Sequence, residues 1–393
     1  MNILFFTAFQ PCANKGGTER TTITLAKSFR ELYGWDSYAA YVVEDGSGKE
    51  DCFQEICRVD EKKCVSQIEE LIRKWKIDCF IDQGELRISA ELDRSGLEKK
   101  CRLILAYHFE PEWDNTFFTR KRLTEELKGA TAKKKLTNGI KLLFFPYFRK
   151  RYVERLRRYC NQSCHNADAV VLLSEGYRKA FAAWGSVGEE ESAKFHAIPN
   201  ALTYPNDYTA RNIYNKEKRV LIVSRLEETQ KRISLALDIW KKVKEDPAAK
   251  GWALSIVGSG EDEALYRTKV EQEKIPNVAF YGRKEPREYY ERSAIFLMTS
   301  KSEGWPLTIS EALQFGVVPV VYDTVAAFQE MIENEKNGML IRDGAEEEYR
   351  AALLKLMTDE EYRFELAKEG IARSARFEPE AIAARWKELI CGL

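Results

Sequence analysis

The sequence lacks both a long apolar run and a basic leader segment. Its longest apolar or aromatic run, Leu142 to Phe148, has seven residues and contains Pro146, whereas a membrane-spanning helix needs roughly 20. The chain opens on a strand-like pattern from Asn2 rather than on a charged segment followed by an apolar one, so no secretory signal peptide is expected. These absences predict a cytoplasmic protein.

Three motifs for bound ions and cofactors are also missing. The nine cysteines are scattered without the short paired spacings of zinc sites or disulfide scaffolds, which predicts reduced thiols with a packing role. No Asp-x-Asp triplet occurs anywhere, so we expect no Mg²⁺ or Mn²⁺ site built on such a pair of carboxylates. No G-x-G-x-x-G follows the first predicted strand, which counts against an NAD site.

Net charge is absent overall but strong in one segment. Lysine plus arginine and aspartate plus glutamate both number 62, so the chain has no general attraction to nucleic acid. Between Arg120 and Arg158, however, fourteen basic residues face three glutamates, a net charge of +11. Because this segment encloses the run 142–148, we expect residues 120–158 to hold the protein peripherally on an anionic membrane surface, at its inner face. The alternative is a solvated helical hairpin whose aromatic residues pack on the domain.

The chain alternates short, almost continuously apolar runs with helix-length amphipathic segments, the pattern of parallel sheets covered by crossover helices. Its 393 residues suffice for two domains of α/β type. We therefore predict two doubly wound Rossmann-like domains that face a cleft, over residues 1–199 and 200–377, with a C-terminal helix at 378–393 packing back on the first. The strands expected in them are 3–6, 38–43, 79–82, 103–107, 169–173 and 195–198, then 220–223, 253–257, 278–281, 295–298, 317–322 and 339–341.

Ligands of open α/β sheets bind beyond the carboxyl ends of the strands, so residues that follow strands are the candidates. Gly16 and Gly17 precede a helix expected from Thr18, where their backbone could approach a ligand or simply form a turn. Arg225 follows the strand 220–223, and Lys231 stands six residues later at a helix entrance. A guanidinium and an ammonium at one corner suit a diphosphate, although a solvated basic turn has the same pattern.

The segment Ser300 to Glu311 combines two carboxylates with a helix start. Glu303 and Glu311 flank Pro306, which fits the first helical position. Leu307 and Thr308 would then offer backbone N–H groups and the positive end of the helix dipole to a phosphate. Carboxylates suit vicinal hydroxyls, so this one element could contact a sugar, phosphates and a ribose.

Together these residues resemble the retaining nucleotide-sugar glycosyltransferases of the GT-B fold, in the large group 4 family, over nearly the whole chain. The resemblance rests on the following segments: Gly16 to Arg20, Ile198 to Asn200, Ser224 to Leu226 with Gln230 and Lys231, Val257 to Gly260, Val278 to Gly282, and Glu303 to Pro306 leading to Glu311 and Ala312. It departs from the family at Ser224, where glycine is frequent, and at Tyr322 to Phe328, which lacks a Gly-Gly pair.

The resemblance implies a role for each candidate residue. Arg225 and Lys231 resemble the ligands of the donor diphosphate, Glu311 the ribose ligand and Glu303 the carboxylate beside the donor sugar. Gly17, with Gly16, resembles a backbone contact near the reaction centre, and His108, after strand 103–107, the histidine that faces the donor sugar. Gly258 either contacts the nucleotide or forms a tight turn, and His108 can also be a hydrogen-bonded loop residue.

The implied activity is metal-independent transfer of a hexosyl or N-acetylhexosaminyl group, with retention of configuration, from a nucleotide diphosphate sugar. A UDP-sugar donor and a glycan or lipid-linked acceptor in surface polysaccharide synthesis are expected, with no cofactor. An oxidoreductase, a phosphorylase with pyridoxal phosphate and a non-catalytic nucleotide-sugar-binding partner subunit remain open as alternatives. The oxidoreductase lacks its glycine fingerprint, and the partner subunit should have lost Arg225, Lys231 or Glu303.

Overall fold

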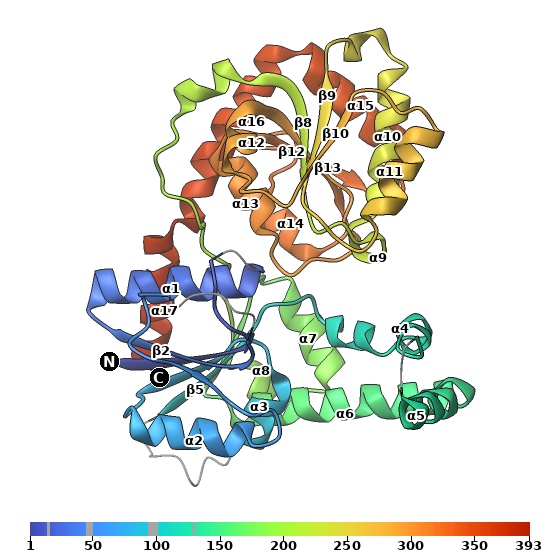
Figure 1. The fold of residues 1–393 in the computed structure, drawn as a ribbon. Helices are drawn as coiled ribbons and strands as arrows, with labels where there is room; N and C mark the ends of the chain where they lie inside the picture. Colours follow the sequence, from blue (N-terminus) through green and yellow to red (C-terminus); the bar gives the residue numbers. More distant parts are fainter. Residues whose placement is uncertain (14–15, 45–49, 93–100, 129–130) are drawn as a thin grey trace. The chain divides into compact units, whose positions relative to one another are not determined.

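A computed structural model describes residues 1–13, 16–44, 50–92, 101–128 and 131–393. The chain forms two compact units (Figure 1). The first contains Met1–Ile198 together with Trp386–Leu393, and the second contains Pro199–Arg385. The last turns of the C-terminal helix α17 (Pro379–Gly392) therefore belong to the first unit. Asn14 and Lys15, in the glycine-containing loop of the sequence, lie outside the described residues.

The first unit is built on a seven-stranded parallel sheet in the order β3-β2-β1-β4-β5-β6-β7. Its strands are β1 (Asn2–Phe9), β2 (Asp36–Val43), β3 (Ile56–Arg58), β4 (Cys79–Asp82), β5 (Arg102–Tyr107), β6 (Ala169–Leu172) and β7 (Phe195–Ala197). Its helices are α1 (Gly17–Tyr33), α2 (Cys64–Lys74), α3 (Leu86–Glu91), α4 (Arg120–Glu125), α5 (Ala132–Leu143), α6 (Phe145–Asn166), α7 (Tyr177–Gly185) and α8 (Glu189–Ser192). Strands β4 and β6 are buried along their whole length, as expected of strands covered by helices on both faces.

The second unit has a six-stranded parallel sheet in the order β10-β9-β8-β11-β12-β13. Its strands are β8 (Glu217–Val223), β9 (Ala253–Val257), β10 (Val278–Gly282), β11 (Ser293–Met298), β12 (Val318–Asp323) and β13 (Met339–Arg342). Besides α17, its helices are α9 (Glu228–Lys231), α10 (Ile233–Lys244), α11 (Glu263–Gln272), α12 (Arg287–Arg292), α13 (Leu307–Gln314), α14 (Ala326–Met331), α15 (Glu346–Thr358) and α16 (Glu360–Ser374). Apolar residues of β8, β9 and β11 pack against α10 and α15 in one continuous core.

The prediction of two doubly wound sheets is confirmed, and each of the twelve expected strands overlaps an observed one. Strand β3 was not predicted. It has three residues at the sheet edge, half-buried or exposed, and so carries no apolar run. Pro306 was expected inside the helix but is its N-cap, with Leu307 as the first helical residue.

The described part of the chain contains no helix with the length and apolar character that crossing a bilayer requires.

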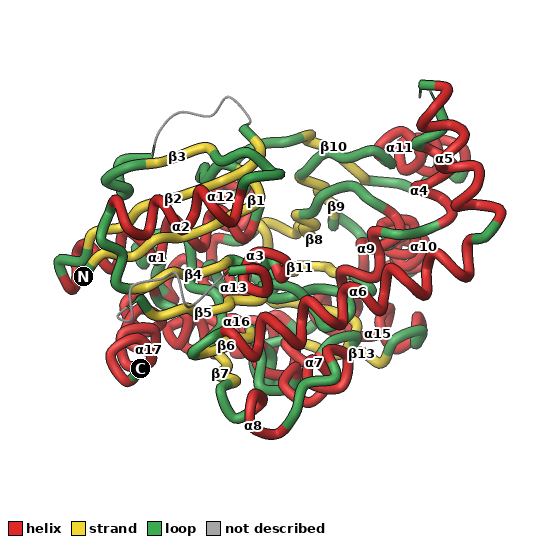
Figure 2. The backbone as a smooth tube through the Cα atoms, turned by 90° about the horizontal axis from the view of Figure 1, so that it is seen from below, coloured by secondary structure: helices red, strands yellow, loops and turns green. Residues whose placement is uncertain are grey.

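Helix α6 reaches well beyond the sheet of the first unit (Figures 1 and 2). The N-terminal end of α6 contacts α5, and α5 contacts α4. The three helices form a projection from that unit.

A glycine turn after β9 fixes the backbone that leads to Arg225. Gly258 has a φ of +141°, and a Cβ at this position would lie 1.8 Å from the carbonyl oxygen of Ser224. The turn is tied to the segment after β8 because Ser224 N donates to Val257 O at 3.0 Å and Leu226 N to Ser259 O at 3.0 Å. Glycine is therefore required at 258 by the chain's own packing.

We predict that Gly258→Ala distorts this corner. The added methyl group overlaps backbone that cannot move aside as a side chain could, so the variant should lose about 3 kcal/mol or more of unfolding free energy. Gly344→Ala is the matched control, because Gly344 also has a positive φ, of +80°, but open space around it; it should cost about 1 kcal/mol. Equal losses in urea unfolding would contradict the close-packing role of Gly258.

Candidate functional site

Residues that follow neighbouring strands of the second sheet meet at one corner. Arg225 follows β8, Lys231 ends α9, and Glu303 follows β11, the strand paired with β8. Lys231 Nζ lies 2.5 Å from Glu303 Oε1, and the two side chains are 15% and 9% exposed. A nearly buried ion pair thus joins the loops after two adjacent strands, as the sequence spacing alone could not show.

Gln230 also links the loop after β8 to the loop after β11. Its Oε1 accepts a hydrogen bond from the Arg225 guanidinium at 2.9 Å, and its Nε2 donates to Ser302 O at 2.9 Å. The backbone oxygen of Gln230 accepts from Lys301 N at 2.7 Å. Gln230 therefore fixes Arg225, which is exposed, against the loop that carries Glu303. The sequence analysis named Gln230 as part of a motif with Lys231 but did not predict a function for it.

A small pocket opens beside the ion pair. Its polar lining comes from Ser224, Lys231, Thr299 and Ser300, and its apolar floor from β8 and β11. Lys231 has three ammonium donors, of which one is directed to Glu303. The other two can serve oxygen atoms of an anion that approaches the ammonium group.

The start of α13 follows Glu303 along the chain. Pro306 precedes the helix with φ −72° and ψ 104°, so the first turn begins at Leu307. Intrahelical carbonyl partners are lacking for the first N–H groups of any helix, and the helix dipole adds positive potential there. Trp305 is buried and packs edge-on against Phe377, with ring centroids 5.2 Å apart, which fixes the entry to the helix.

The side chain of Glu311, which the sequence predicts as a ribose ligand, is 0% exposed. Tyr290 Oη donates to its Oε2 at 2.9 Å, and Thr203 Oγ1 donates to its Oε1 at 3.1 Å. Thr203 belongs to the segment that enters the second unit, and Gln314 Nε2 holds the next two carbonyls of that segment, both at 3.1 Å. A ligand could reach Glu311 only if the segment carrying Thr203 shifted.

The first unit holds the remaining candidates at the carboxyl edge of its sheet. Gly16 is the N-cap of α1 in extended conformation, and Gly17 is the first helical residue. A Cβ at Gly16 would lie 2.7 Å from Glu19 Oε2, so the glycine allows this carboxylate to fold over the helix start. His108 follows β5, is 9% exposed and pairs through Nε2 with the Gln83 side-chain oxygen, after β4.

Two buried carboxyl groups of the first unit, those of Asp82 and Asp114, were not singled out by sequence reasoning. Burial raises the pKa of Asp82 to about 7, opposed by hydrogen bonds from the Ser89 hydroxyl and from backbone N–H groups. Burial, and then the charge of Glu85, raises the pKa of Asp114 to about 7. Asp82 ends β4, and its burial could have been read from an apolar strand that closes on an acid. Asp114 lies in a 3-10 helix of five residues, Trp113–Phe117, which gave no such signal.

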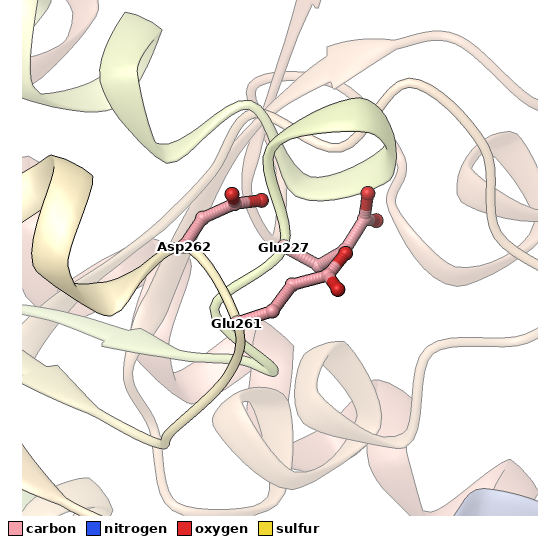
Figure 3. Close-up of side chains that lie close together, drawn as sticks. All are labelled: Glu227, Glu261 and Asp262. Atoms are coloured by element: carbon pink, nitrogen blue, oxygen red, sulfur yellow. The ribbon is translucent and has the colours of Figure 1, made fainter. Parts of the chain in front are cut away.

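Figure 3 shows an acidic cluster at two adjacent turns of the second unit, formed by Glu227, Glu261 and Asp262. One carboxylate oxygen from each lies within 4.8 Å of the others. Glu227 accepts from the N–H groups of Thr229 and Gln230, at 2.9 and 3.0 Å, and Asp262 accepts from that of Glu228 at 2.8 Å. These two carboxylates therefore stabilise the start of α9, which explains the grouping without an ion.

The sheets and this corner can be compared with known proteins. Residues 205–373 match the family model of the glycosyl transferases group 1. This segment of the second unit is therefore similar in sequence to that family. The chain is 32% identical over 193 residues to the amylovoran biosynthesis glycosyltransferase AmsD of Erwinia amylovora, covering 49% of this chain and 52% of AmsD. It is 26% identical over 224 residues to the poly(glycerol-phosphate) alpha-glucosyltransferase of Bacillus subtilis, covering 56% of this chain and 32% of that enzyme.

The chain thus spans about half or less of the length of these two relatives. Over its whole length it is similar in structure to HepE of Anabaena, solved with UDP and glucose, with a TM-score of 0.73, 16% identity and 100% coverage of both chains. TarM of S. aureus, solved with UDP, gives a TM-score of 0.71 at 14% identity, with 99% of both chains covered. These likenesses confirm the GT-B fold.

The Lys231–Glu303 pair yields a prediction on stability. Lys231→Met leaves the Glu303 carboxylate almost buried without its cation, which should cost about 3 kcal/mol of unfolding free energy. The double variant Lys231→Met/Glu303→Gln should recover part of that loss, and a double-mutant cycle in urea unfolding measures the coupling. Strictly additive effects would show that the pair is not coupled as the geometry indicates.

Proposed function

We propose that the protein is a metal-independent, retaining glycosyltransferase that uses a UDP-sugar. It moves a hexosyl or N-acetylhexosaminyl group to a glycan or lipid-linked acceptor in the synthesis of a surface polysaccharide. The observation that carries the proposal is the corner where Gln230 holds the Arg225 guanidinium and Glu303 holds the Lys231 ammonium, with the start of α13 four residues beyond Glu303.

A diphosphate fits this corner better than a neutral ligand does. The Arg225 guanidinium offers a planar pair of donors held by Gln230, and Lys231 adds a compact charge. The N–H groups of Leu307 and Thr308 can bind further oxygens without a side chain. Positive groups that are already fixed in place need little reorganisation when charge develops on the leaving diphosphate.

The proposed transfer breaks the bond between the anomeric carbon and the diphosphate oxygen and forms a bond from the same carbon to the acceptor oxygen on the same face. The proton of the acceptor hydroxyl passes to the departing diphosphate oxygen, so no protein base is required. The transition state has oxocarbenium character, and its counter-charge rests on the diphosphate. Arg225 and Lys231 thus contribute most where the leaving group gains charge.

Other residues would bind and orient the donor. Glu303, fixed by Lys231, would accept hydrogen bonds from hydroxyls of the donor sugar through its carboxylate. Glu311 would bind the ribose once the segment with Thr203 has moved, with Tyr290 keeping it in place. We assign His108 and the Gly16–Gly17 backbone to the sugar side of the reaction, and Gly258 to the shape of the Arg225 corner.

The comparisons support the donor and the pathway class. HepE was solved with UDP-glucose, and the O-GlcNAc transferase GtfA of pneumococcus with UDP and GlcNAc. Relatives in sequence act in amylovoran and O-antigen biosynthesis, as their names say. A UDP-sugar and a polysaccharide acceptor are therefore the donor and acceptor to test first.

Nucleotide binding tests the proposal directly. UDP should raise the melting temperature of the protein more than GDP or ADP does, because a ligand that binds only the folded state stabilises it. Arg225→Ala and Lys231→Ala should weaken this effect and lower turnover at least tenfold, about 1.4 kcal/mol or more. Arg342→Ala, which removes a cation 80% exposed, is the control and should change neither.

Several results would contradict the proposal in different ways. Stabilisation by GDP or ADP but not by UDP would overturn the donor assignment. UDP binding that depends on both cations, without turnover of any UDP-sugar, would favour the non-catalytic partner subunit. Unchanged binding and turnover in both variants would reject the diphosphate site.

Metal independence is a separate prediction. Because Arg225 and Lys231 would neutralise the diphosphate, and because Glu227 and Asp262 already accept hydrogen bonds from the start of α9, activity should be unchanged in excess EDTA. Initial rates before and after chelation measure this. Loss of activity on chelation with recovery on adding Mn²⁺ would show that a metal takes part.

A further inference from the structure

The projection made by α4, α5 and the start of α6 exposes large apolar side chains in a row. Leu136, Ile140 and Leu143 of α5 are 68%, 45% and 74% exposed, and Phe144 and Tyr147 beyond it are both 55% exposed. Exposed apolar residues are ordinary when isolated, but a contiguous group of this kind marks an interaction surface. We call these five residues the apolar row.

Helical geometry places the three residues of the apolar row that belong to α5 on one face of that helix. At about 100° per residue, Leu136, Ile140 and Leu143 lie within about 60° of one another, and Asn138 lies opposite them. Asn138 is 2% exposed and donates to Glu126 at 3.1 Å, just beyond α4. The polar residue thus faces inward and the leucines outward, the reverse of an ordinary surface helix.

Some aromatic residues at the junction of α5 and α6 pack on the domain, and others are exposed. Phe145 stacks on Phe118 with centroids 5.7 Å apart, and the guanidinium of Arg120 lies 4.7 Å from the Phe145 ring. Phe144 and Tyr147, in contrast, are exposed like the other residues of the apolar row. Packing on the domain therefore accounts for only part of the run, and the outward residues extend the exposed face of α5.

Basic side chains surround the row. Lys133, Lys134 and Lys135 are exposed on the first turn of α5, and Lys150 and Arg151 are exposed on α6. The segment 120–158 carries a net charge of +11 in a chain whose total is zero. The three acids of this segment are already near cations, since Lys121, Lys134 and Lys150 lie 4.0, 3.3 and 3.9 Å from Glu125, Glu126 and Glu154.

We propose that this face of α5 and the start of α6 docks on a bilayer of anionic phospholipid. Apolar side chains at the centre would enter the headgroup region, and the basic residues around them would face lipid phosphates. Charge complementarity selects this partner. A second copy would bring the same positive charge to the contact, and a nucleic acid would leave the apolar row uncovered. The apolar row shares no residue with the candidate donor site, so this proposal does not depend on the proposed activity.

The test is sedimentation of the full chain with vesicles of phosphatidylcholine alone or mixed with phosphatidylglycerol. Binding should require the anionic lipid and should weaken as salt rises, because salt screens exposed charges. One variant removes apolar side chains of the row: Leu136→Ser/Ile140→Ser/Leu143→Ser. The other removes basic charges around it: Lys133→Gln/Lys134→Gln/Lys135→Gln/Lys150→Gln. Each should weaken vesicle binding at least tenfold while nucleotide binding stays unchanged.

Matched control variants distinguish binding through this surface from non-specific effects of charge and of exposed apolar residues. Leu265→Ser removes a leucine that is 50% exposed in the second unit. Lys250→Gln/Lys274→Gln/Lys336→Gln/Lys368→Gln removes four lysines of that unit, and both controls should bind vesicles normally.

Three outcomes would overturn the proposal. The first is absence of sedimentation with anionic vesicles at low salt. The second is equal loss of binding in the control variants. The third is a protein that fails to bind vesicles but self-associates in analytical ultracentrifugation, with the triple serine variant monomeric, which would make the row an interface between copies.

Discussion

The ion pair between Lys231 and Glu303 joins the two segments on which the candidate site depends. One segment leaves β8 and carries Arg225, and the other leaves β11 and leads to α13. Since β8 and β11 are neighbours in a parallel sheet, their ends are close, and hydrogen bonds and the ion pair beyond the strands fix the two loops against each other. Gln230 is hydrogen-bonded to both segments as well. Together with the ion pair, these bonds hold the two loops against each other.

Two further contacts stabilise this corner: the glycine turn after β9 and the packing of the buried Trp305. Gly258 lets one loop pass directly over Ser224, and Trp305 packs on Phe377 before the helix begins. The positive groups therefore keep their positions without a ligand. This preorganisation is what a site for a charged leaving group requires, because reorganisation in the transition state would raise the barrier.

Local patterns in the sequence were sufficient for the sheets and for the loops that carry Arg225, Lys231 and Glu303. Buried parallel strands such as β4 and β9 are short apolar runs, whereas β3 is too short and exposed to have a pattern. Contacts between distant segments could not be predicted in this way. Thr203 and Glu311 are 108 residues apart, and nothing in either segment indicates that the hydroxyl closes off the carboxylate.

A crystal structure of the protein with UDP tests the central claim most directly. The account predicts diphosphate oxygens within hydrogen-bonding distance of the Arg225 guanidinium, of Lys231 Nζ and of the first N–H groups of α13. Glu311 should then contact the ribose, with Thr203 displaced. A diphosphate bound elsewhere, or held through a metal ion on Glu227, Glu261 and Asp262, would contradict the account.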